Sequence, residues 1–211
     1  MKGPADTHLS SAPGIPVNRE KRTIGLYGGS FNPIHCGHIA LAKQLLRLAK
    51  LDEIWFMVSP LNPLKAHNSD LLADNLRLQM AREALQDEPR LVASDEEFHL
   101  PKPSYTWQTL QHLRAKHPDC DFVLLIGADN WMVFDHWFHH EDILRHYPVI
   151  IYPRPGSPID KAQLPPRVCL ADTPLLNISS TEIRRRVRLG QSVWGLVPAS
   201  IVAMVQEWYR S

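Results

Sequence analysis

The chain has 211 residues with 23 basic and 22 acidic side chains, which gives a formal net charge of +1 at pH 7. That balance provides no general electrostatic attraction for nucleic acid or for a membrane surface, and we expect neither as a partner. The hydrophobic fraction of 44% is ordinary for a globular protein, and no apolar run approaches the roughly 20 residues that a membrane-spanning helix needs.

One domain is the simplest organisation for a chain of this length. We expect it to cover residues 23–211, because residues 1–22 carry several glycines and prolines and little periodic apolar content, which indicates a mobile tail. The three cysteines, Cys36, Cys120 and Cys169, are widely spaced and form no CxxC pair. Together with an N-terminus that lacks the charged-then-apolar order of a signal peptide, they indicate a cytoplasmic location.

Strand-like and helix-like segments alternate from Thr23 onward. Short apolar runs predict strands, and apolar residues at helical spacing, such as Leu72, Leu76, Met80 and Ala84, predict helices. In chain order we expect a strand at 23–27, a helix at 39–50, a strand at 54–58, a helix at 70–85, a strand at 90–93, a helix at 106–116, strands at 122–126, 149–152 and 168–170, and helices at 181–189 and 198–209. This alternation predicts an α/β fold, a Rossmann-like open parallel sheet with helices on both faces.

The most informative segment runs from Tyr27 to His38 and reads YGGSFNPIHCGH. It lies between the first predicted strand and the first predicted helix, where an open parallel sheet binds its ligands. Glycines there allow the backbone to approach a ligand closely, and the helix start offers N–H groups to an anion. His35 and His38 can donate hydrogen bonds to phosphate oxygens. Taken alone, the two histidines are also compatible with half of a metal site or with ordinary surface residues.

A second anion-binding pattern lies near the C-terminal end, in the sequence NISSTEIRRR at residues 177–186. Ser179, followed three residues later by Glu182, is a capping box, so the plainest interpretation is a well-capped helix with a basic exposed face. The same segment also brings hydroxyl and N–H groups together with Arg184 one turn into the helix, as the binding of a triphosphate requires.

These two segments resemble the two signatures of the nucleotidyltransferases with an H-x-G-H motif. The first is G-G-S-F-N-P-I-H-x-G-H, which ends at His38, and the second is I-S-S-T-x-I-R. Four segments between them narrow the resemblance to the nicotinate-nucleotide adenylyltransferases, over about residues 23–208. They are the Pro-rich stretch 59–65, PSYT at 103–106, GAD at 127–129 with Trp137 downstream, and RPG at 154–156.

The resemblance implies transfer of an adenylyl group from ATP to nicotinate mononucleotide, giving deamido-NAD and pyrophosphate in NAD biosynthesis. Mg²⁺ would bridge the triphosphate, with no metal ligand from a protein side chain. His35 and His38 would be the catalytic phosphate contacts. Other contacts to ATP and its phosphates would come from Gly28, Gly29, Ser30, Phe31, Gly127, Asp129, Ile178, Ser179, Ser180, Thr181 and Arg184.

For the mononucleotide, the resemblance implies that Tyr105 and Thr106 hold the pyridine carboxylate and that Trp137 stacks on the pyridine ring. Asn32, Lys65 and Arg154 would complete this set. Two positions depart from the family pattern: Asn32 stands where many members have aspartate, and Leu64 stands where many have histidine. We expect the reaction to survive both changes, because they leave the two histidines and the C-terminal arginine in place. The anchoring of the mononucleotide phosphate stays open.

Three alternatives remain open at the level of the sequence. A sister nucleotidyltransferase would act on nicotinamide mononucleotide or on another phosphorylated small molecule, although the chain lacks the R-T-x-G-I-S-T pattern of cytidylyltransferases. A non-catalytic nucleotide-binding module would keep the fold without the chemistry. A metal-binding protein would use some of the 11 histidines, but the adjacent pair His139 and His140 is poorly spaced for ligands on a helix. The sequence allows a homo-oligomer and fixes no symmetry for one.

Overall fold

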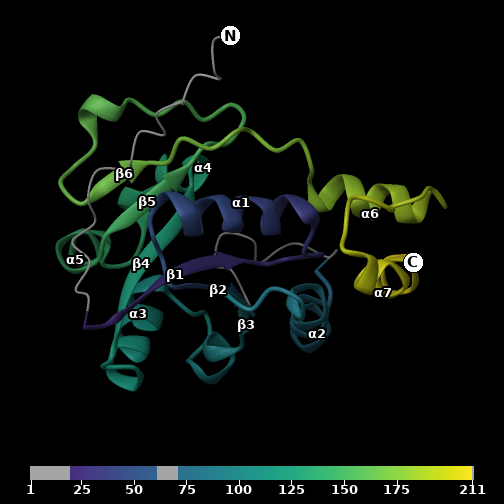
Figure 1. Cartoon of the computed structure of the whole chain (residues 1–211), viewed down its shortest axis with the longest axis horizontal. Helices are drawn as coiled ribbons and strands as arrows, with labels where there is room; N and C mark the ends of the chain where they lie inside the picture. The colour runs from purple at the N-terminus through teal and green to yellow at the C-terminus, as the bar shows by residue number, and fades with distance from the viewer. Residues whose placement is uncertain (1–19, 61–70, 211) are drawn as a thin grey trace, which may run out of the picture.

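The structure is a computed structural model that describes residues 20–60 and 71–210. Within these ranges, six strands form one parallel sheet in the order β3-β2-β1-β4-β5-β6 (Figure 1). This is the strand order of the Rossmann fold, and it confirms the predicted open parallel sheet. The strands are β1 (Arg22–Gly29), β2 (Glu53–Val58), β3 (Leu91–Ser94), β4 (Cys120–Gly127), β5 (Val149–Tyr152) and β6 (Val168–Leu170).

Helices cover both faces of the sheet. The α-helices are α1 (Cys36–Leu48), α2 (Asp74–Leu85), α3 (Thr106–Lys116), α4 (Ala128–Trp131), α5 (His140–His146), α6 (Ser180–Arg188) and α7 (Val202–Trp208). Short 3-10 helices are η2 (Glu96–His99), η3 (Phe134–His136), η4 (Lys161–Gln163) and η5 (Ala199–Ile201). No helix within the described ranges is long and apolar enough to cross a membrane.

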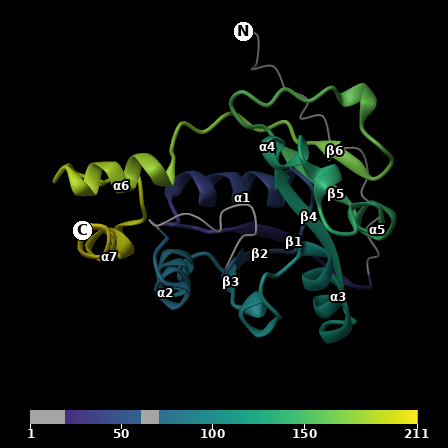
Figure 2. The same cartoon turned by 180° about the vertical axis from the view of Figure 1, so that it is seen from behind.

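Two apolar clusters hold the helices against the sheet. They are separate because neighbouring residues of a strand point to opposite faces. In β4, Val123 and Leu125 join the cluster that includes α1, α2, α6 and α7. Phe122, Leu124 and Ile126 join the cluster that includes α3 and α5. Figures 1 and 2 show α6 and α7 together beyond one end of the sheet, near α2.

The predicted element boundaries agree best where an apolar run is continuous, and β5 and β6 match them at both ends. The first strand is longer than predicted and includes Arg22 and both glycines, so the expected tail at residues 1–22 extends too far. Residues 1–19 of that tail, Lys65 and the first residue of the predicted helix at 70–85 lie outside the described ranges. Helix α1 begins at Cys36 instead of Ile39, because His35 caps it three residues earlier.

The buried face of α2 includes Met80 and Ala84 of the predicted stripe, whereas Leu76 is only half-buried and Leu72 lies before the helix. Its buried residues are Arg77, Leu78, Met80, Ala81, Ala84 and Leu85. Arg77 is 0% exposed and donates to the carbonyl oxygens of Ser30 at 2.5 Å and Ser59 at 2.9 Å, while Asp74 lies 2.7 Å from its guanidinium. The buried guanidinium therefore links the segment that follows β1 to the segment that follows β2. A charged side chain is rarely buried in this way unless it is paired.

Candidate active site

The predicted site residues gather at the carboxyl ends of β1 and β4. These strands are neighbours in the sheet, although β2 and β3 separate them in sequence. The strand order reverses at this point, and the crevice outside such a switch point is the usual ligand site of an open α/β sheet. Gly28 and Gly29 end β1, Gly127 ends β4, and helices α1 and α4 follow.

His35 and His38 cap the start of α1 reciprocally. His35 Nδ1 accepts from the backbone N–H of His38 at 3.3 Å, and His38 Nδ1 accepts from the backbone N–H of His35 at 3.2 Å. The two rings stack with their centroids 3.5 Å apart. A ring nitrogen that accepts a hydrogen bond carries no proton, so each imidazole is neutral with its proton on Nε2. That atom of each ring can donate to a phosphate oxygen.

His35 is held in its neutral form. It is only 4% exposed, and burial, helped by the positive charge of Arg154, lowers its pKa to about 3. Gly37 makes room for the ring, since a Cβ at this position would lie 3.0 Å from His35 Nδ1 and 3.4 Å from the Cβ of Ile178. A larger residue at the glycine of the H-x-G-H motif would therefore press against the His35 ring.

The turn between β1 and α1 has a strained residue at its centre. Phe31 adopts φ of +44°, a conformation that costs free energy for a residue other than glycine. Its ring is 3% exposed and packs edge-on against Tyr27 and His38, with centroid distances of 5.5 and 5.1 Å. The Phe31 ring therefore supports the His38 ring, which also stacks on His35.

The C-terminal pattern lies directly against this turn. Ser180 Oγ donates to the carbonyl oxygen of Pro33 at 2.9 Å, and Arg184 Nη1 donates to that of Asn32 at 2.8 Å. The structure thus brings together the two segments that are about 145 residues apart in the sequence. Ser179 Oγ caps α6 by accepting from the N–H of Glu182 at 3.2 Å, as predicted from the spacing.

Several predicted contacts to substrate have a clear scaffolding role. Arg184 is 8% exposed, and its second amino group lies 3.5 Å from Thr181 Oγ1. Asn32 is 5% exposed, and its Oδ1 accepts from Tyr209 Oη at 2.6 Å and from the N–H of Leu72 at 3.2 Å. The roles assigned to Asn32 and Arg184 in substrate binding remain predictions.

Gly127, Asp129 and Arg154 form a second group beside the histidines. A Cβ on Gly127 would lie 2.3 Å from Asp129 Oδ1 and 3.2 Å from Arg154 Nε, so only glycine fits there without a shift. Asp129 Oδ1 lies 3.8 Å from Arg154 Nε. Arg154 lines a small hollow with His35, His38 and Ile178 and is absent from the lining of the larger pocket described below, although the resemblance assigned it to the mononucleotide.

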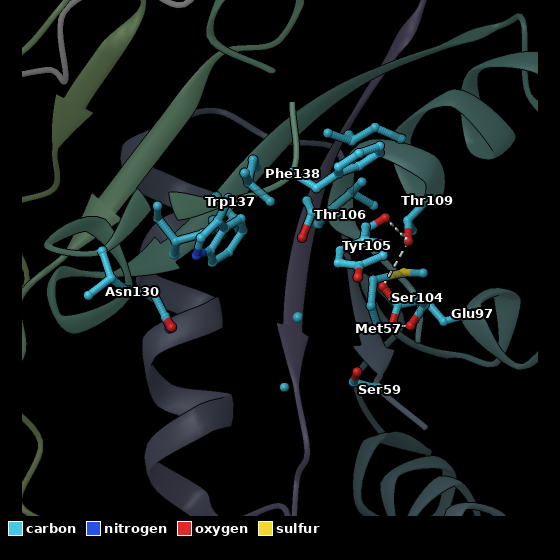
Figure 3. Close-up of a pocket in the computed structure, with 18 of the residues that line it drawn as sticks. Met57, Ser59, Glu97, Ser104, Tyr105, Thr106, Thr109, Asn130, Trp137 and Phe138 are labelled. Atoms are coloured by element: carbon cyan, nitrogen blue, oxygen red, sulfur yellow. Dashed lines mark hydrogen bonds between the residues drawn. The ribbon is translucent and has the colours of Figure 1, made fainter. Parts of the chain in front are cut away.

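The larger pocket has a volume of about 500 Å³, within the range of small-molecule sites. Figure 3 shows Trp137 on one side and Tyr105, Ser104 and Glu97 on the other, with Thr106 between them. Trp137 packs against Phe134 with a centroid distance of 5.2 Å. Described residues that line the pocket are Leu26, Gly28, Gly29, Met57, Ser59, Glu97, Ser104, Tyr105, Thr106, Thr109, Leu110, Leu124, Leu125, Ile126, Asn130, Val133, His136, Trp137, Phe138 and Tyr152.

Sequence reasoning missed two charged residues of this region, Arg77 beneath the turn and Glu97 in the larger pocket. Neither belongs to a motif, and only the tertiary structure shows that Arg77 is buried and that Glu97 is half-buried in the pocket wall. Glu97 accepts hydrogen bonds from Ser104, which belongs to the PSYT segment, and from Thr109, which follows that segment by three residues. The sequence therefore indicated the region around Glu97 but not Glu97 itself. Phe138 follows Trp137 directly, and its ring lies 5.0 Å from that of Tyr105.

The chemistry available at this site is hydrogen bonding to phosphate. Among the described residues, no three side chains of His, Cys, Asp or Glu come together as a metal centre would require. Burial raises the pKa of the Cys36 thiol, which favours the protonated form and disfavours a nucleophilic role for it. The site offers neutral imidazoles, helix starts and guanidinium groups, the donors that a polyphosphate needs.

Fold and site together define a nucleotidyltransferase of the Rossmann-like class, and a family model described as Cytidylyltransferase-like matches residues 26–186. The relative described as "Probable nicotinate-nucleotide adenylyltransferase" from Bacteroides fragilis is 49% identical over 188 residues, covering 89% of this chain and 93% of that protein. A relative with the same description from Bacteroides thetaiotaomicron is 44% identical, covering 90% of this chain and 94% of that protein. The chain belongs to the nicotinate-nucleotide adenylyltransferase family.

Solved structures agree on the fold. The Plasmodium falciparum nicotinic acid mononucleotide adenylyltransferase complexed with NaAD matches with a TM-score of 0.72 at 22% identity, covering 89% of this chain and 94% of that chain. A Vibrio parahaemolyticus structure described as a putative nicotinate-nucleotide adenylyltransferase matches with a TM-score of 0.65 at 19% identity, covering 90% and 96% of the two chains.

Proposed function

We propose that this protein transfers the adenylyl group of ATP to nicotinate mononucleotide, giving deamido-NAD and pyrophosphate in NAD biosynthesis. The observation that carries the proposal is the reciprocal cap, which leaves the proton of both motif histidines on Nε2 at the carboxyl end of β1. The family of the chain and the pocket beside this cap support the choice of substrate.

In the proposed reaction, the phosphate of the mononucleotide attacks the α-phosphorus of ATP in line, and pyrophosphate leaves. That phosphate is already ionised at neutral pH, so the reaction needs no strong general base and no protein nucleophile. Catalysis comes from alignment of the two substrates and from donors that match the charge developing on the transferred phosphate. His35 and His38 supply these donors as neutral groups, and their cap keeps them oriented.

The β- and γ-phosphates lie, in this proposal, at the start of α6. The first N–H groups of a helix have no partner within the helix, and those of Ser180 and Thr181 begin α6. A guanidinium has five N–H donors, so Arg184 retains donors beyond the one given to Asn32. On the ATP side, Asp129 and the backbone at Gly127 are the proposed contacts to ribose and adenine.

A divalent cation accompanies ATP in this proposal, and Mg²⁺ is the expected ion. The side chains around the turn are mostly donors and cations, which fits an ion carried by phosphate oxygens and water better than one held by protein ligands. When bound, it neutralises part of the charge of the triphosphate. The chain's own residues then bind the phosphates, orient them and limit their exposure to water.

Tyr105, Thr106 and Trp137 are the proposed contacts to the pyridine group. The start of α3 provides backbone N–H groups for a carboxylate, and Trp137 offers a flat apolar surface for the ring. One observation favours nicotinamide mononucleotide as an alternative substrate: the pocket already contains the carboxyl group of Glu97. A second negative charge is less easily placed beside it than an uncharged carboxamide.

Pyrophosphate release from Mg-ATP, measured with nicotinate and nicotinamide mononucleotides side by side, tests the proposal. We expect rapid turnover with the nicotinate form and a much lower kcat/KM with the nicotinamide form. Equal turnover with both would remove the claimed selectivity and keep the chemistry. A folded protein that binds ATP and releases no pyrophosphate with either substrate would instead be a non-catalytic nucleotide-binding module.

A further inference from the structure

Glu97 places a carboxyl group in the pocket that is proposed to receive the carboxylate of the substrate. It lies in η2 and accepts hydrogen bonds from Thr109 Oγ1 at 3.0 Å and from Ser104 Oγ at 3.3 Å (Figure 3). Ser104 and Thr109 lie on either side of Tyr105 and Thr106 in sequence. Glu97 therefore holds the backbone at the start of α3 in place. This backbone is the proposed contact to the pyridine carboxylate.

Two ionised carboxylates in one partly dry pocket repel each other, and one of them is expected to take up a proton. Glu97 already tends that way: burial raises the pKa of its carboxyl group, although hydrogen bonds from Thr109, Ser59 and Ser104 act in the lowering direction. A bound nicotinate carboxylate adds like charge and raises this pKa further. Among the described residues, no lysine, arginine or histidine forms an ion pair with Glu97.

The hydrogen-bond network around Glu97 accommodates both protonation states. Thr109 Oγ1 lies 3.0 Å from Glu97 Oε1 and 3.3 Å from the carbonyl oxygen of Tyr105, but a hydroxyl has only one proton to donate. With Glu97 ionised, Thr109 donates to the carboxylate. With Glu97 protonated, the acid donates to Thr109 and Thr109 donates to Tyr105. Neither state leaves a buried polar atom without a partner, so the exchange costs little.

The other charged groups near Glu97 on η2 and β2 are engaged with other partners or are exposed. On η2, Glu96 binds Lys116 and His112 of α3, and His99 is exposed. On β2, Glu53 pairs with Arg22 at the opposite end of the strand. The remaining titratable side chains that line the pocket are Tyr105, His136 and Tyr152.

We propose that Glu97 is a positioning residue for the start of α3 that takes up one proton from solvent when the pyridine carboxylate binds, and so makes affinity for the nicotinate form depend on pH. This inference rests on the proposed function. An uncharged carboxamide does not require the proton, so nicotinamide mononucleotide lacks this component. Affinity for the nicotinate form therefore falls as pH rises, while the affinity for the nicotinamide form keeps only the pH dependence that both substrates share.

The test is the ratio of KM for nicotinate mononucleotide to KM for nicotinamide mononucleotide between pH 6 and 8.5. Where one form is not turned over, its inhibition constant replaces KM. The ratio cancels titration of the phosphate group, which both mononucleotides carry. In the wild type it should rise with pH, by at most about tenfold per pH unit for one proton. Glu97→Gln, which imitates the protonated acid, should flatten it to within about twofold over the whole range.

Glu96→Gln is the matched control, because Glu96 is the neighbouring carboxylate on the same 3-10 helix and faces Lys116. It should keep the slope of the wild type. The same slope in all three proteins, or a flat ratio in the wild type, would overturn the role of Glu97. Absence of turnover and of inhibition with both mononucleotides would overturn the proposed function, and this inference with it.

A direct measurement covers the case in which Glu97→Gln does not fold. Calorimetric titration of the wild type with each mononucleotide, in two buffers of different ionisation enthalpy, counts the protons taken up on binding. We expect greater uptake with the nicotinate form, by at most one proton, with its maximum at a pH between the pKa of Glu97 in the free protein and that in the complex. Equal uptake with both forms would overturn the inference.

Discussion

Replacement of His35 by asparagine should make the protein less sensitive to acid. Asparagine is a good N-cap residue, and its Oδ1 can accept from the N–H of His38 as the imidazole does. The substitution thus keeps the cap of α1 and removes the titratable ring. In the wild type, His35 Nδ1 accepts that N–H at 3.3 Å inside a buried site, so protonation of the ring breaks the hydrogen bond and buries a charge.

The direction of the effect follows from the two pKa values. An unfolded histidine titrates near 6.5, whereas burial and Arg154 lower the pKa of folded His35 to about 3. Below pH 6.5 the unfolded chain takes up a proton that the folded chain does not, so stability is present above this pH and is lost as the pH falls toward 3. At pH 5 the loss is about 2 kcal/mol, and it does not depend on the exact folded pKa provided that this lies well below 5.

Urea unfolding at pH 5, 6, 7 and 8 measures this effect. The wild type should lose about 2 kcal/mol more than His35→Asn between pH 8 and pH 5. His99→Asn, which changes an exposed histidine outside the cap, controls for loss of a histidine as such. Parallel plots of unfolding free energy against pH for the wild type and His35→Asn would refute the conclusion that His35 is neutral in the folded protein. They would also refute the assignment of its proton to Nε2.

The other predictions concern the turn and the two pockets. His38→Ala should lower kcat by roughly 10²-fold or more while circular dichroism shows an intact fold; near-normal turnover would contradict a direct phosphate contact. Trp137→Ala should raise KM for the mononucleotide by about two- to tenfold with little change in KM for ATP, and an unchanged KM would argue against stacking. Gly28→Ala should leave the melting temperature unchanged, because a Cβ there meets nothing within 4 Å; weakened ATP binding by Gly28→Ala would show that the space belongs to the ligand. Arg77→Met should destabilise the protein by about 3 kcal/mol or more, because it leaves buried carbonyl groups without donors, and denaturant midpoints within error of the wild type would contradict this.

The sheet could be predicted because its strands are buried on both faces and therefore appear as continuous apolar runs. Val149–Tyr152 is such a run, and its boundaries agree with the structure at both ends. The short helices α4 and α5 were not predicted. In α5 only Ile143 is buried, so its seven residues show no apolar periodicity, and His139 before it adopts a left-handed conformation with φ of +55°.

The identity of the site could be predicted from the sequence, but its internal geometry could not. The spacing of His35 and His38 is that of a capping box, three residues apart, yet histidine is seldom considered as a cap, and the predicted helix began at Ile39. The spacing was present in the sequence, and the structure shows that the two histidines form the cap of α1. In α2 the predicted stripe ran through Leu72 and Leu76, whereas the helix turns Arg77 inward, because the carbonyl groups of two loops distant in sequence require its donors.

The scaffolding contacts bear on the proposal that this turn binds phosphate, because its backbone carries carbonyl oxygens as well as N–H groups. The carbonyl groups of Ser30, Asn32 and Pro33 are bound by Arg77, Arg184 and Ser180 respectively. A carbonyl oxygen that faces a phosphate repels it, so donors that hold these three oxygens inside the protein remove an unfavourable term from the site.

Two of these three donors are also cations, and their charge lies beneath the turn in a region screened from water. Positive charge placed in this way acts on a phosphate more strongly than it would at the surface, and it requires no rearrangement when the charge of the transition state develops. The C-terminal pattern can therefore support catalysis even where a side chain such as Arg184 does not touch the substrate. Arg184→Lys keeps the charge but loses the fixed fork of donors, so a fall in kcat greater than any rise in KM for ATP would indicate positioning of the turn, and the reverse would indicate a direct phosphate contact.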